Sequence, residues 1–94
     1  MKLPEHATLE QTAELAATLP AEVAAGTGVL EIDASALKAF DSSTLALLLH
    51  ARRLAQAAGR GFNVKAAPEQ LGQLARLYGV EELLPSSDPR SSVA

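Results

Sequence analysis

The densest group of side chains that could take part in chemistry lies in a row at Asp41, Ser42, Ser43 and Thr44. The row stands directly before a leucine-rich stretch with helical spacing, so a carboxylate and several hydroxyl groups meet at a helix start. Aspartate and serine are preferred helix caps, each contributing about 1 kcal/mol, but one helix start needs only one cap. A phosphate is also stabilised there, by free backbone amides and the helix dipole. Two interpretations stay open: a helix cap on a contact surface, which we favour, or phosphorylation of Ser42 or Ser43.

The other polar residues predict no catalytic, metal or cofactor site. His6 and His50 have no companion at the spacing of metal ligands, and no motif pairs a nucleophile with a base. No glycine-rich phosphate-binding loop occurs either. Asp33 ends a strand-like stretch, where α/β folds gather ligands, but capping of the next turn is the favoured interpretation. We therefore expect a protein that is not an enzyme and that holds no cofactor and no metal.

The leucine-rich helix, expected over residues 43–58, carries more apolar residues than one core face requires. At 100° per residue, the core face comprises Thr44, Leu47, Leu48, Ala51, Leu54, Ala55 and Ala58. Leu45 and Leu49 lie roughly 100–160° from the centre of that face, beside arginines. Apolar residues on a non-core face are typical of a docking surface, and cover by neighbouring loops is the alternative. The predicted partner-binding residues are Asp41, Ser42, Ser43, Thr44, Leu45, Leu49, Arg52 and Arg53.

The strands expected around this helix are short. Apolar stretches at 29–33 and 61–66 are typical of strands. Residues 1–4 are typical of the end of another strand. Residues 34–40 are expected to be a connection. Strands alternate with helices along the chain, which predicts an α/β fold with at least partly parallel strands.

Two further helices flank the leucine-rich one. The first is expected to start with a capping box at Thr8 and Gln11 and to be kinked or divided at Pro20. The last is expected after Pro68, with Tyr78 on its inner face. Three main helices therefore cover the predicted sheet.

The composition sets the outer limits of function. The 94 residues suffice for one domain, expected over residues 1–85, followed by a disordered Ser- and Pro-rich tail at 86–94. A net charge of −3 gives no electrostatic reason to bind nucleic acid or an anionic membrane. Cysteine is absent, and no apolar run of 18 residues occurs. We expect a cytoplasmic protein, without direct membrane insertion, that reaches a membrane only through a partner.

The stretches V-L-E-I-D at 29–33 and F-D-S-S-T-L-A-L-L-L-H-A-R-R-L-A at 40–55 resemble the STAS domain family. This family includes anti-sigma-factor antagonists and MlaB, a subunit of a bacterial lipid transporter. The stretch L-A-R-L-Y-G-V-E-E-L-L-P at 74–85 is similar to the MlaB branch. The resemblance covers roughly residues 1–85 and implies a mixed β-sheet, of about three to four strands here, backed by helices.

The resemblance also implies roles for the serines. In the antagonist branch, the phosphorylated serine corresponds to Ser43. In MlaB-like proteins, the residue after the aspartate, Ser42 here, lies at the contact with the ATPase of an ATP-binding-cassette (ABC) transporter. MlaB stabilises and activates that ATPase.

Two departures from the family stand out. The glycine that usually follows the hydroxyl pair is Thr44 here, so docking through this position is altered. The N-terminal hairpin is truncated to a few residues, which leaves an open sheet edge with which a second copy could pair as a homodimer.

Two functions are therefore expected. The first is a non-enzymatic accessory subunit that binds the ATPase of an Mla-type lipid ABC transporter at the inner membrane. The alternative is an anti-sigma-factor antagonist that binds a kinase-like anti-sigma factor and is switched by phosphorylation at Ser43. The motif at 74–85 favours the first, and the serine pair slightly favours the second.

Overall fold

The structure is a computed structural model, and it describes residues 1–84. Its elements follow the chain as β1 (His6–Ala7), α1 (Leu9–Ala24), β2 (Leu30–Asp33), β3 (Ala39–Phe40), α2 (Ser42–Ala57), β4 (Phe62–Lys65), α3 (Glu69–Leu77) and the 3-10 helix η1 (Glu81–Leu83). The predicted α/β alternation is confirmed, with three main helices and short strands. The expected tail at 86–94 lies outside the described residues.

The strands pair in parallel. Strand β2 pairs with β4, with Ile32 opposite Val64, and β1 pairs with β3. Lys2 forms an isolated parallel bridge with Asp33, so the N-terminal segment lies beside β2. Strand β3 lies in the stretch expected to be only a connection. It was missed because two residues are too few to show a strand pattern.

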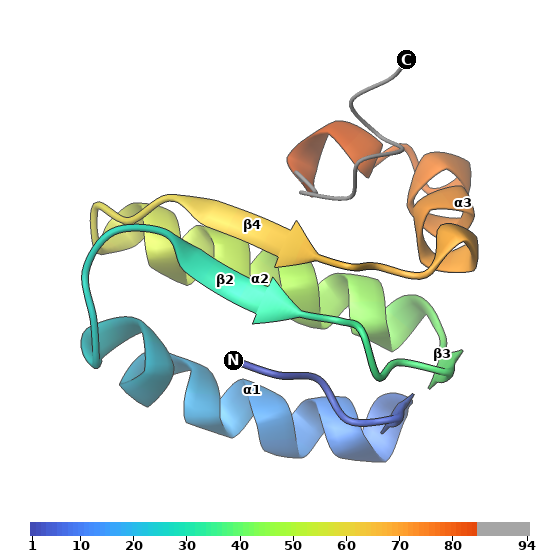
Figure 1. The fold of residues 1–94 in the computed structure, drawn as a ribbon, viewed down its shortest axis with the longest axis horizontal. Coiled ribbons are helices and arrows are strands. Elements are labelled where there is room, and N and C mark those ends of the chain that lie inside the picture. Colours follow the sequence, from blue (N-terminus) through green and yellow to red (C-terminus); the bar gives the residue numbers. More distant parts are fainter. Residues whose placement is uncertain (85–94) are drawn as a thin grey trace.

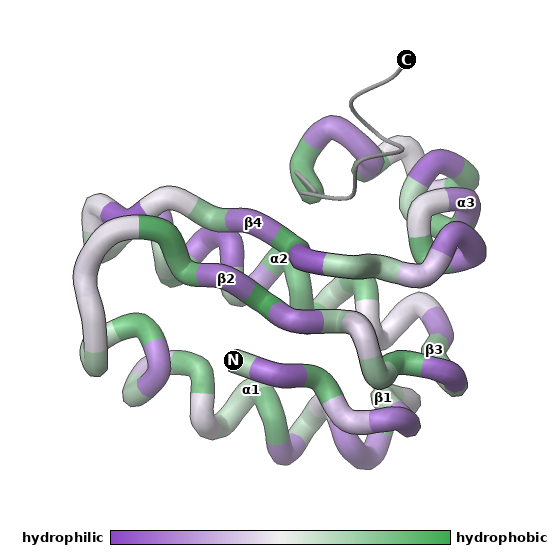
Figure 2. The backbone as a smooth tube through the Cα atoms, in the orientation of Figure 1, coloured by the Kyte–Doolittle hydropathy of each residue, from purple (hydrophilic) through white to green (hydrophobic). Residues whose placement is uncertain are grey.

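Helices α1 and α2 run side by side behind the strands (Figure 1). Hydrophilic and hydrophobic residues alternate along β2 and β4 (Figure 2). This alternation directs Ile32 and Val64 into the core, while Glu31 and Lys65 are exposed. The core therefore lies between one face of the strands and the helices, and no described helix covers the other face in Figure 1.

The core is built from aliphatic side chains. Its buried members come from every main element: Leu3, Ala7, Leu19, Val23, Leu30, Ile32, Ala34, Leu37, Leu45, Leu47, Leu48, Ala51, Ala55, Val64, Leu71 and Ala75. Both aromatic phenylalanines, Phe40 and Phe62, pack against this cluster while only partly buried. The alanines of this core allow the strands and the helices to approach closely.

Several local expectations were wrong. Helix α1 is not divided at Pro20, because buried Leu19 and Val23 hold the helix to the core on both sides of the lost hydrogen bond. The Thr8–Gln11 capping box does not form; the Thr8 hydroxyl instead donates to the Gln11 side-chain oxygen at 2.7 Å. Tyr78 is 57% exposed, because α3 ends at Leu77 and the chain then turns.

Candidate functional site

The start of α2 is closed by a reciprocal cap. Asp41 is the N-cap, and its Oδ1 atom accepts a hydrogen bond from the Ser43 amide at 2.9 Å. The Asp41 amide in turn donates to the Thr44 hydroxyl at 3.2 Å, which completes a capping box. The Ser43 hydroxyl also donates to Asp41 Oδ1. One carboxylate thus orients both the helix start and the Ser43 side chain.

Thr44 belongs to the interior, not to the surface. Its side chain is fully buried, and its hydroxyl donates to the Ala7 carbonyl at 2.5 Å. This bond ties the start of α2 to β1. Thr44 was predicted among the partner-binding residues, but the structure gives it no accessible atoms, so its place in a contact surface is corrected. The hydroxyl that replaces the usual glycine is used within the fold.

Leu45 is also corrected. It was expected outside the core, yet it is 3% exposed and belongs to the core cluster. Helix α2 buries residues from Leu47 round to Leu45, an arc of roughly 160° at 100° per residue. The predicted core face was narrower than this arc, so Leu45 fell outside it. Leu49 is half-buried and lies outside that cluster, as expected.

An apolar groove lies between the N-terminal halves of α1 and α2. It has a volume of about 260 Å³ and is lined by Leu9, Thr12, Ala13, Ala16, Ser43, Ala46, Leu47 and His50. Leu9 is 69% exposed and adds an accessible apolar side chain to this groove. Ser43 lies at one end of this groove, and its hydroxyl is hydrogen-bonded to Asp41. The groove was not predicted, because it requires two helices to lie together.

The arginines of α2 differ in their surroundings. Arg52 is half-buried, and one of its Nη atoms lies 3.5 Å from the Gln56 side-chain oxygen. Arg53 is exposed. The ion pairs among residues 1–84 are formed elsewhere, by Lys38 with Glu5 at 3.8 Å and by Arg76 with Glu81 at 3.0 Å. The exposed side of α2 therefore carries positive charge that has no acidic partner in this part of the chain.

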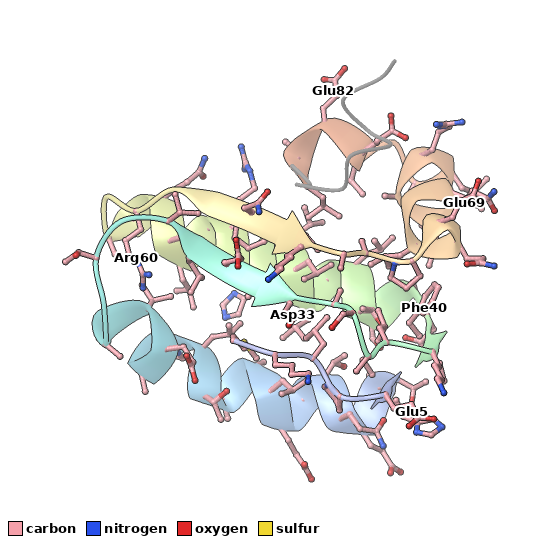
Figure 3. The ribbon with its side chains drawn as sticks, in the orientation of Figure 1. Glu5, Asp33, Phe40, Arg60, Glu69 and Glu82 are labelled. Atoms are coloured by element: carbon pink, nitrogen blue, oxygen red, sulfur yellow. The ribbon has the colours of Figure 1, made fainter. Side chains whose placement is uncertain are left out.

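The opposite end of α2 is held by Arg60. Its guanidinium donates to carbonyls at the end of α1 and in the next loop, those of Val23 at 2.9 Å, Gly28 at 3.1 Å, and Glu22 and Val29 at 3.3 Å. Figure 3 shows Arg60 reaching toward the end of α1. A cation at a helix C-terminus is favoured by the helix dipole. A second hollow, of about 530 Å³, lies beside this arginine, but the guanidinium is committed to the backbone.

Asp33 has the structural role that was favoured for it. Its carboxylate accepts a hydrogen bond from the Ser35 amide at 2.9 Å and so caps the following turn. Hydrogen bonds from the Ser35 side chain and amide, with Lys2 and Lys65 nearby, lower the pKa of Asp33 below its ordinary value. Figure 3 shows Asp33 at the end of β2, and Asp33 does not line the groove.

The described residues hold no other group suited to chemistry. Within residues 1–84, no cluster of histidine, aspartate and glutamate could hold a metal ion. No helix in this range is both long and apolar enough to cross a membrane. The candidate site is therefore the surface formed by the α2 cap, the groove and the exposed side of α2.

The family comparison decides the relationship. A family model described as "Mlab, STAS domain" matches residues 1–85. This chain belongs to the STAS domain family. The predicted resemblance is thereby confirmed, including its MlaB-like character. STAS domains are generally binding and regulatory modules that mediate contacts between proteins.

A solved structure supports the same fold for this STAS domain. It is an anti-sigma-factor antagonist (STAS) domain protein from Planctomyces limnophilus, with 15% sequence identity and a TM-score of 0.78. The alignment covers 98% of this chain and 84% of that one. No curated protein matches this chain. At this identity the likeness concerns the fold, so the roles of Ser42, Ser43, Leu49, Arg52 and Arg53 remain predictions.

Proposed function

We propose that this STAS domain is a non-enzymatic accessory subunit that binds the ATPase of an Mla-type lipid ABC transporter. The proposal rests chiefly on the family model, whose description names the Mlab branch over residues 1–85. In this function the protein is cytoplasmic and peripheral at the inner membrane, where the transporter holds it. Its contact surface comprises the exposed part of the predicted site: Asp41, Ser42, Ser43, Leu49, Arg52 and Arg53.

The geometry of α2 supports a contact role. The capping box makes the helix start rigid, because the Asp41 and Thr44 side chains satisfy two backbone groups. Ser42 is exposed beside the cap, while Leu49 and Arg53 continue along the same side of the helix. A rigid helix that presents an apolar residue between a serine and an arginine loses little conformational freedom on binding, which favours affinity.

An anti-sigma-factor antagonist switched by phosphorylation is the second candidate. The Ser43 hydroxyl favours it, because this group is partly accessible and lies at a helix start. A phosphoryl group would add roughly −1.5 to −2 charges beside the Asp41 carboxylate and at the end of an apolar groove. The repulsion and the cost of desolvation would then release a partner. Here the partner would be a kinase-like anti-sigma factor.

The first experiment is gentle purification of the tagged protein from its native cells, followed by mass spectrometry of partners and of Ser42 and Ser43. The transporter proposal expects an ABC ATPase in stoichiometric amount, with unmodified serines. Recovery of a kinase-like anti-sigma factor, with phosphate on Ser43, would replace it by the second candidate.

Two variants then test the surface. Leu49→Asp should abolish binding of the ATPase, because it places a charge in the contact, while the protein stays folded with at most a small loss of stability. Ser42→Glu should weaken binding through charge. Leu77→Asp on α3 is the matched control, since Leu77 is 78% exposed and lies outside the proposed surface. Equal binding by Leu49→Asp and Leu77→Asp would remove α2 from the interface.

A further inference from the structure

The groove between α1 and α2 has the size and chemistry of a receptor for a side chain. Its walls are almost wholly apolar, with Leu9, Ala13 and Ala46 at its rim. Its volume of about 260 Å³ lies below the ~300–1,000 Å³ of most small-molecule pockets. On each helix the first and last lining positions are seven positions apart, which corresponds to about 10 Å of groove length. Two turns of another helix would span that length.

The charges beside the groove restrict the chemistry of the occupant. Ala46, His50 and Arg53 are exposed and succeed one another at helical spacing, so they form one stripe on α2 that begins at the groove and continues one turn past its end. His50 lies in the groove wall, one turn before Arg53. Arg53 has no acidic partner in residues 1–84, although the whole chain has a net charge of −3. A segment that covers this stripe therefore gains most by carrying an acidic group opposite Arg53.

We propose that the groove receives an apolar side chain from a helix of the partner protein, and that an acidic residue of the same helix pairs with Arg53. This inference rests on the proposed function, because it assumes a protein partner at α2. It adds a second contact element, α1 through Leu9, and it specifies the partner segment as an apolar helix face with an acidic flank. Helix-in-groove docking of this kind uses apolar anchors one turn apart.

The hydrogen bond from the Ser43 hydroxyl to Asp41 also bears on docking in the groove. Ser43 lines the groove, and its hydroxyl is held by Asp41 rather than pointing freely to the partner. An unmodified Ser43 thus leaves the groove wall apolar. A negative charge introduced at this position would have to be desolvated when the groove is covered, which costs binding free energy.

The test uses the complex obtained from native cells and a photo-crosslinking residue, benzoylphenylalanine, placed at one position at a time. Position 46 lies on the groove, and position 72 on exposed α3 is the control, where a side chain meets no atoms within 4 Å. We expect position 46 to crosslink to a partner peptide with an apolar residue and an aspartate or glutamate within one helical turn. Position 72 should give no such product.

Charge exchange completes the test. Arg53→Glu should weaken binding about tenfold, because it places like charges together, and Arg53→Lys should retain most of the affinity. Changing the crosslinked acidic residue of the partner to lysine should restore binding to Arg53→Glu. A basic or uncharged partner peptide, or unchanged binding by Arg53→Glu, would overturn the inference. A crosslink from position 46 to a second copy of this chain would also overturn it, in favour of a homodimer.

These outcomes separate the inference from the proposed function. If the ATPase is retained but crosslinks only from position 72, the accessory-subunit proposal stands and the groove inference fails. If no ATPase is retained by the unmodified protein, the proposed function itself fails.

Discussion

The hydroxyl of Thr44 accepts a hydrogen bond from the Asp41 amide at 3.2 Å and donates one to the Ala7 carbonyl at 2.5 Å. One side chain thus joins the cap of α2 to β1 inside the core. In the family pattern a glycine at this position would allow close approach of a partner. Here the position stabilises the junction, and the accessible part of the site begins at its neighbours, Ser42 and Ser43.

Replacement of this hydroxyl tests its role. Thr44→Val should lower the free energy of unfolding by about 1–3 kcal/mol, because the buried Ala7 carbonyl loses its donor while the side-chain volume is nearly kept. Urea unfolding of both proteins measures the difference. Ser42→Ala is the control, since Ser42 is exposed and should leave stability within about 0.5 kcal/mol. Equal stability of the two variants would show that the Thr44 bonds contribute nothing net.

At the scale of elements, α2 supports both the core and the proposed surface. Its buried arc includes Leu45 and Leu47, while Leu49 and Arg53 remain at the surface. Leu45 and Leu49, four residues apart, therefore differ in burial, although their sequence surroundings are similar.

Truncation of Leu45 and of Leu49 should separate a role in the core from a role in binding. Leu45→Ala should cost about 2–5 kcal/mol of stability, the range for a buried leucine, and should reduce partner binding only through unfolding. Leu49→Ala should cost about 1 kcal/mol or less and should weaken binding in the folded protein. Thermal unfolding and binding by the same preparations provide the measurement. A larger stability loss for Leu49→Ala would place Leu49 in the core.

Arg60 lies in the turn between α2 and β4, and its guanidinium binds the end of α1 and the loop before β2. Arg60→Met keeps most of the aliphatic stem but removes every donor to the carbonyls of Glu22, Val23, Gly28 and Val29. We expect a loss of about 1–3 kcal/mol, measured by urea unfolding. Arg53→Met is the matched control and should leave stability nearly unchanged. A similar effect of both changes would indicate that general charge, and not the Arg60 bonds, is responsible.

At the scale of the whole molecule, the core cluster draws its members from Leu3 to Ala75, with partly buried support as far as Leu84. The family model ends at a similar point, residue 85. The expected domain over residues 1–85 remains a prediction, and its tail lies outside the described part of the chain.

A truncation at the C-terminal end and a substitution near the N-terminal end provide a direct test. Removal of residues 86–94 should leave the melting temperature unchanged, because residues 1–84 already supply a core cluster with members from every main element. Leu3→Ala is the contrasting change near the other end and should destabilise the fold by about 2–5 kcal/mol, since Leu3 is 1% exposed. Calorimetry of both variants measures the effect. A clear drop for the shortened protein would show that the tail packs on the domain.

The sequence by itself determined the alternation of the main helices and strands, the α/β class and the stretch 41–43 at which α2 begins. These follow from local rules, because apolar spacing and capping residues act within a few positions of one another. The burial of Leu45 and the exposure of Tyr78 were decided only by the tertiary structure. Burial of a side chain depends on how many neighbouring elements surround its helix, and a single helical wheel does not contain that information. The groove between Leu9 and Ala46 has the same origin, since it exists only where α1 and α2 lie side by side.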